Sequence, residues 1–65
     1  MNTAFTKKNK LGYWVGCLRY SNGVEAEVTN AFDHEWRALE VAERMRAAAD
    51  QLDTERARFA PLNIV

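Results

Sequence analysis

Apolar residues recur at spacings of three and four along the second half of the chain, from residue 33 to residue 59. They fall on one stripe of a helix, and this stripe comprises Ala38, Val41, Ala42, Met45, Ala48, Ala49, Leu52 and Phe59. No Gly or Pro interrupts the segment, Asp33 is a suitable N-cap, and Pro61 ends the pattern. We therefore predict a single long amphipathic helix over residues 33–59.

The pattern changes in the first half of the chain, where two β-type runs, residues 13–21 and 24–29, flank the dipeptide Asn22-Gly23. This dipeptide is typical of a two-residue type I′ hairpin turn, which would place Tyr20 opposite Glu25. Alternation then predicts a small apolar face that packs on the helix, formed by Tyr13, Val15, Cys17, Val24, Ala26 and Val28. The opposite face would carry Trp14, Leu18, Tyr20, Glu25, Glu27 and Thr29.

These elements predict an α+β fold in which a β-hairpin packs on one long helix, in the order ββα. Residues 1–10 are polar and are predicted to be a flexible segment, so that residues 11–65 form the single domain. Because a two-stranded sheet is only marginally stable, a third strand would help. Residues 61–65 (PLNIV) are predicted to supply it, either by pairing within the chain or with another molecule.

A mismatch in length predicts association. A helix of about 27 residues would be about 40 Å long, whereas a hairpin arm of about 9 residues spans about 30 Å. Either the helix breaks near residues 50–54, or its second half packs on another chain. Cys17 is the only cysteine, so no disulfide stabilises this small domain. We expect a homodimer whose seam includes Ala48, Leu52 and Phe59.

The predicted outer face of the hairpin is the main indication of function. Trp14, Leu18 and Tyr20 would stand in a row, with Glu25 and Glu27 at their rim, as anchors and rim do in a protein interface. The alternative is that the C-terminal tail or a flattened hairpin covers these rings. We therefore expect a protein-binding module.

Charge leaves nucleic-acid binding as an alternative. Aromatic residues alternate with Lys7, Lys8, Lys10 and Arg19 in the N-terminal half, an arrangement that can stack bases and hold phosphates. Against this, the net charge is zero and the two glutamates would repel a phosphate backbone. A contact of the lysine cluster with an acidic partner or with phosphate is an alternative, although a short lysine run near a terminus is usually a solubilising tail.

Neither catalysis nor metal binding is indicated. Cys17 lies in the middle of a predicted strand with no neighbour in sequence that would lower its pKa, and a histidine such as His34 at the start of a helix is usually solvated. One cysteine and one histidine do not form a metal cluster, and no glycine loop for phosphate precedes the helix. We expect no enzyme activity and no cofactor. With neither a signal-type segment nor an apolar run of membrane-spanning length, we expect a cytoplasmic protein.

Residues 32–45 (FDHEWRALEVAERM) resemble the strand-to-helix step of many small ββα modules, with Ala38, Leu39 and Ala42 at the usual packing positions. In size and element order the chain also resembles small accessory proteins of bacteriophages and prophages, which include anti-CRISPR proteins and inhibitors of host enzymes. This resemblance implies an inhibitor that occupies a surface of a larger host complex. A structural subunit of a larger assembly is a further alternative.

Overall fold

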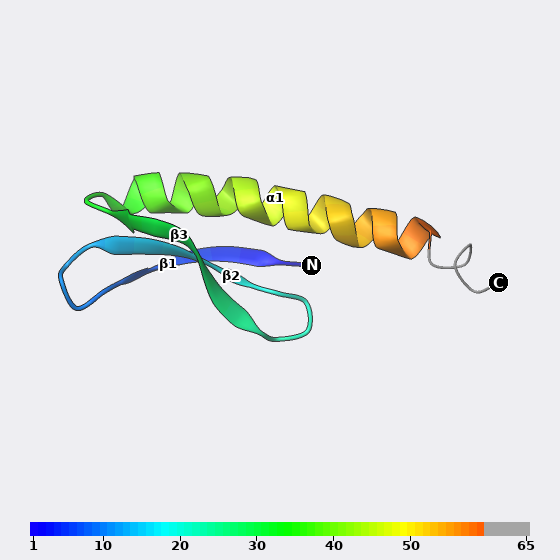
Figure 1. Ribbon diagram of the computed structural model, residues 1–65, viewed down its shortest axis with the longest axis horizontal. Coiled ribbons are helices and arrows are strands. Elements are labelled where there is room, and N and C mark those ends of the chain that lie inside the picture. Colours follow the sequence, from blue (N-terminus) through cyan, green and yellow to red (C-terminus); the bar gives the residue numbers. More distant parts are fainter. Residues whose placement is uncertain (60–65) are drawn as a thin grey trace.

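The computed structural model describes residues 1–59, with side chains as far as Ala57. Three strands, β1 (Thr3–Lys8), β2 (Trp14–Arg19) and β3 (Glu25–Phe32), are followed by one helix, α1 (Glu35–Phe59). The strands form an antiparallel sheet in the order β1-β2-β3, and α1 lies across one face of it (Figure 1). The predicted α+β fold is confirmed. The predicted strand at residues 61–65 lies outside the described residues.

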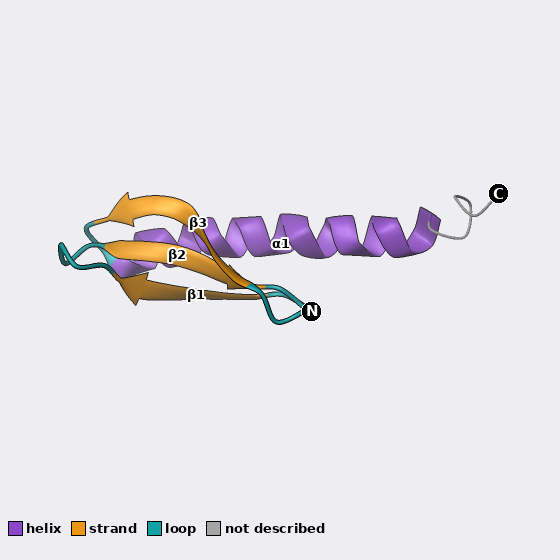
Figure 2. Ribbon diagram, turned by 60° about the horizontal axis from the view of Figure 1, so that its bottom comes forward, coloured by secondary structure: helices purple, strands orange, loops and turns teal. Residues whose placement is uncertain are grey.

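The third strand is β1, at the N-terminal end, where a flexible segment was predicted. It pairs with β2 from Thr3 opposite Arg19 to Lys8 opposite Trp14, and Figure 2 shows β2 between its two neighbours. Asn9 stabilises the connecting turn, because its side-chain oxygen accepts the backbone N–H groups of Leu11 and Tyr13, both at 2.9 Å. The prediction was wrong because four of the six residues in TAFTKK are Thr or Lys, a composition that indicates a polar tail more than a strand.

The β2–β3 turn has three residues, Ser21, Asn22 and Gly23, and not the two that were predicted. The N–H of Tyr20 donates to the carbonyl of Val24 at 2.8 Å, and the N–H of Gly23 donates to the carbonyl of Tyr20 at 2.9 Å. Gly23 has a φ of 90°, whereas no residue other than glycine has a positive φ in the described chain. This is a type I turn followed by a left-handed glycine, so the predicted type I′ turn was wrong.

The extra turn residue shifts the strand register by one position. Leu18 pairs with Ala26 and Cys17 pairs with Glu27, whereas the predicted register placed Leu18 opposite Glu27. Since side chains alternate between the faces of a sheet, a shift of one residue exchanges the faces. Ala26 faces α1 as predicted. On β2, however, Leu18 faces α1, whereas Val15 and Cys17 had been predicted to do so.

The core forms where α1 crosses β2 at very short range. Gly16 provides the space, since a Cβ atom there would lie 2.6 Å from the carbonyl oxygen of Ala38 and 2.9 Å from the Cβ of Ala42. Ala38 and Ala42 are fully buried, and Leu18 next to them is 1% exposed. Small residues on both elements therefore let the helix backbone rest almost directly on the central strand.

Opposite Gly16, strand β3 is irregular. Val15 pairs with Ala31 and Cys17 pairs with Glu27, so residues 28–30 of β3 lie opposite Gly16 alone. The hydroxyl of Thr29 accepts the N–H of Gly16 at 2.8 Å and thus replaces the missing ladder bond. Bulges of this kind bend a strand, and in Figure 1 β3 crosses the sheet and turns away from α1 toward the hairpin end.

Helix α1 runs without interruption from Glu35 to Phe59, which confirms the prediction of a single long helix and excludes a break near residues 50–54. Its second half extends past the sheet (Figure 1). In the part of the chain that the structure describes, no helix combines the length and hydropathy needed to cross a bilayer.

Candidate protein-binding groove

The five residues predicted to bind a partner do not share a surface. Leu18 is buried beneath α1, and Tyr20 is half-buried beside the helix. Glu25 and Glu27 lie on the opposite face of the sheet, because they pair with Arg19 and Cys17. The register shift is the reason, and the predicted row of exposed anchors with an acidic rim was wrong. Trp14 is half-buried as well, with the Lys8 ammonium 5.7 Å from the centre of its ring.

The face of the sheet away from α1 carries paired charges. The Lys7 ammonium lies 2.9 Å from the Glu27 carboxylate, and this contact raises the pKa of Lys7. Arg19 donates to Glu25 at 2.6 Å, and its guanidinium carbon lies 5.8 Å from the centre of the Phe5 ring. Cys17 is buried beneath this layer, and burial raises the pKa of its thiol. This thiol therefore lacks the environment of a nucleophile.

A groove opens on the other side, between the β2–β3 hairpin and the second half of α1. It has a volume of about 440 Å³ and is lined by Asn2, by residues of β2 and the β2–β3 turn, and by α1. Its apolar lining is contributed by Leu18, Tyr20, Met45, Ala48, Ala49 and Leu52. Met45 is 44% exposed and Leu52 is 59% exposed, so the apolar stripe of α1 continues into solvent where the sheet no longer covers it.

One end of the groove is fixed by Asn2, which is 3% exposed. Its side-chain nitrogen donates to Asp50 at 2.8 Å and to Asp53 at 3.0 Å, and its side-chain oxygen accepts the N–H of Ser21 at 3.0 Å. Asn2 thus ties β1, the hairpin turn and α1 together. Its backbone N–H also donates to Asp50, and these bonds, followed by the nearby Arg46, lower the pKa of Asp50.

Sequence reasoning missed Asn2 because it belongs to the segment that was predicted to be flexible. A signal was present on the helix, where Asp50 and Asp53 lie three residues apart on one side. The buried side-chain amide of Asn2 donates a hydrogen bond to each of these carboxylates.

Two residues of the predicted dimer seam, Ala48 and Leu52, belong to the lining of this groove. Both are exposed on α1, at the edge that the sheet leaves uncovered. The side chain of Phe59 lies outside the described part of the structure. The seam stays a prediction, and two of its three residues are accessible to a partner.

The remaining chemical candidates are dispersed. His34 lies at the start of α1 and stacks on the exposed ring of Trp36, with the ring centres 6.4 Å apart. Among residues 1–59, no group of three His, Cys, Asp or Glu side chains could hold a metal ion. No protein-family model, curated protein sequence or solved structure matches the chain.

Proposed function

We propose that this chain is a non-enzymatic protein-binding module, and that it binds its partner along the groove and the uncovered edge of α1. The observation that carries the proposal is the exposure of Met45 and Leu52 on α1, where both line the groove. Apolar side chains gathered in a groove with polar residues at its rim are characteristic of protein interfaces.

The shape of the groove favours a helix as the bound element. One wall is α1 and the other is the β2–β3 hairpin, so an amphipathic helix could contact both walls with a single apolar face. The polar rim, with Asn22, Asp53 and Arg56, offers hydrogen-bond groups but no concentrated charge of one sign. Such a site suits an apolar helix surface better than a small charged ligand.

The charge arrangement disfavours the nucleic-acid alternative. Lys7, Arg19 and Arg44 each lie against a carboxylate, at Glu27, Glu25 and Glu40 respectively. Arg46 bridges Glu43 and Asp50 at 2.8 and 2.6 Å. Cations paired in this way do not form the basic stripe that follows a phosphate backbone.

The test is an affinity capture with the purified full chain as bait in extract of its source cell. We expect Leu52→Glu to abolish recovery of the partner, because it places a charge in the apolar groove. Ala47→Glu is the matched control, since Ala47 is exposed on α1 outside the groove and should retain the partner.

Circular dichroism establishes that both variants keep the helix. Equal recovery of the same protein by Leu52→Glu and the unmodified chain would contradict the proposal. The identity of the captured protein separates an inhibitor of a larger host complex from a structural subunit of an assembly.

A further inference from the structure

A line of four residues runs along the uncovered edge of α1: Arg44, Ala48, Leu52 and Glu55. Their spacings of four, four and three keep them on one ridge of the helix. Arg44 and Glu55 are separated by about three turns, or about 16 Å. The ridge is positive at one end, apolar in the middle and negative at the other end.

The charges on two such ridges are complementary only when the two helices run antiparallel. If two copies of α1 pack antiparallel about a two-fold axis between residues 49 and 50, Arg44 of each copy faces Glu55 of the other. In the same register Ala48 lies within one residue, or about 1.5 Å along the helix axis, of the position opposite Leu52, so a small side chain packs beside a large one at both contacts. A parallel pair in register would instead place Arg44 against Arg44 and Glu55 against Glu55.

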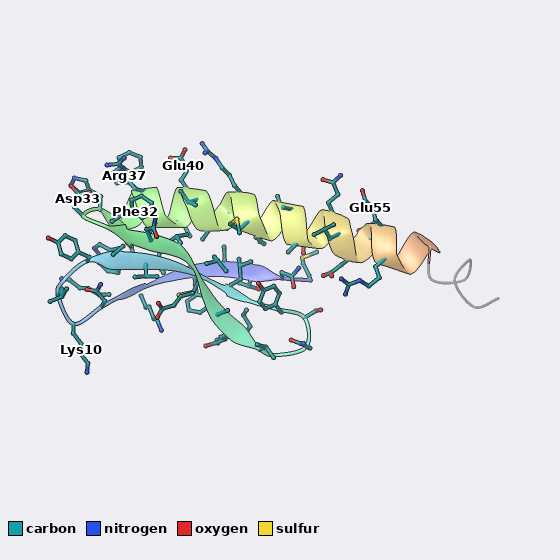
Figure 3. The ribbon with its side chains drawn as sticks, viewed as in Figure 1. Lys10, Phe32, Asp33, Arg37, Glu40 and Glu55 are labelled. Atoms are coloured by element: carbon teal, nitrogen blue, oxygen red, sulfur yellow. The ribbon has the colours of Figure 1, made fainter. Side chains whose placement is uncertain are left out.

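Of the two end residues, Arg44 is exposed and Glu55 is half-buried. The side chain of Arg44 is 73% exposed, and its bond to Glu40 at 2.7 Å is a surface pair between residues four apart. Pairs of this kind are weak, so Arg44 can turn to a second carboxylate at little cost. The carboxylate of Glu55 accepts from Gln51 at 3.4 Å, a long bond, and Figure 3 shows Glu55 on the part of α1 that lies beyond the sheet.

We infer that the partner bound at this edge is a second copy of the chain, held as an antiparallel, two-fold symmetric pair of α1 helices through Ala48, Leu52 and the reciprocal contacts of Arg44 and Glu55. This inference rests on the proposal that the uncovered edge of α1 binds protein. The zero net charge of the chain is compatible with it, since two copies do not repel each other as a whole.

Sedimentation equilibrium of the full chain, from low micromolar to millimolar concentration, is the measurement. We expect a monomer–dimer equilibrium in the unmodified chain. Arg44→Glu alone and Glu55→Arg alone should each raise the dimer dissociation constant about tenfold, because the two-fold axis makes one substitution disrupt both ion pairs. The double variant R44E/E55R should return the constant to near its original value.

Two features make the charge exchange decisive. The double variant keeps the local repulsion between residues 40 and 44 that Arg44→Glu introduces, so recovery cannot come from the helix of a single copy. Lys10→Glu changes the net charge as Arg44→Glu does, and Lys10 lies at the end of the molecule remote from Glu55 (Figure 3). It should leave the equilibrium unchanged.

A monomer at every concentration would overturn the inference, and so would a double variant that associates no better than the single ones. Neither result would remove the proposed function if affinity capture still distinguished Leu52→Glu from Ala47→Glu. If those two variants behaved alike in capture as well, both the inference and the proposed function would fall.

Discussion

Gly16 is the residue at which the sheet and α1 come closest. A methyl group there would lie 2.6 Å from the carbonyl oxygen of Ala38, which is backbone and cannot move without displacing the helix. We expect Gly16→Ala to lower the free energy of unfolding by about 1–3 kcal/mol, the usual cost of overpacking a closely fitted core. Urea denaturation followed by circular dichroism measures this change. An unchanged midpoint would show that α1 does not lie on β2 at this distance.

Asp50 makes the stability of the fold depend on pH. Hydrogen bonds from Asn2, together with Arg46, hold its pKa in the folded chain below the ordinary value of 3.8. The stabilisation by ionised Asp50 is therefore complete above pH 3.8, and it is lost as the pH falls through that value toward the lower pKa of the folded chain.

We expect Asp50→Asn to be less stable than the unmodified chain at neutral pH, with the difference shrinking as the solution is acidified below pH 3.8. Thermal unfolding of both chains across this pH range measures the difference. A gap between them that stayed constant with pH would mean that Asn2 stabilises the fold without favouring the charged form of Asp50.

At the scale of elements, sequence reasoning succeeded for α1 and failed for the faces of β2. The helix is predictable because its signals are local: apolar residues at spacings of three and four, good helix formers throughout, and a proline after the end. The faces of a strand depend on register, and register here depends on whether the turn has two residues or three. Asn22-Gly23 is compatible with both, since Gly23 takes a positive φ in either turn.

The groove could not be predicted for a related reason. It is formed by residues far apart in the sequence, since Asn2 and Leu18 line it together with Met45 and Leu52. Their relative positions depend on β1 and on the register of β2, neither of which was predicted. The sequence did indicate that the second half of the helix would exceed the sheet, and the exposure of Ala48 and Leu52 agrees with that expectation.

The strand register can be tested through Leu18, which faces α1 in the observed register and would face solvent in the predicted one. We expect Leu18→Ala to lower the free energy of unfolding by about 2–4 kcal/mol, because it leaves a cavity beneath the helix. Tyr13→Ala, at an exposed position before β2, should have a much smaller effect. Chemical denaturation of the two variants gives the comparison, and a larger loss for Tyr13→Ala than for Leu18→Ala would favour the predicted register, which packs Tyr13 on the helix.

At the scale of the whole molecule, a short sheet is joined to a long helix. The chain measures 51 × 18 × 15 Å, and the turns of α1 beyond the sheet are held mainly by their own backbone hydrogen bonds. Isolated helical turns are marginally stable in water, because tertiary packing supplies most of the stability of helices in proteins. The second half of α1 is therefore the part of the described chain that gains most from a bound partner.

Hydrogen exchange resolves this difference along the helix. In dilute solution, we expect the amides of residues 52–57 to exchange much faster than those of residues 38–42, which lie over the buried contact with Gly16. If copies of the chain associate through α1, raising the concentration should slow exchange at residues 52–57 and leave residues 38–42 unchanged. In Leu52→Glu the concentration dependence should disappear while the dilute pattern remains. Uniform protection along α1 in dilute solution would mean that the second half of the helix is stable without a partner, and the structural reason for association would then be lost.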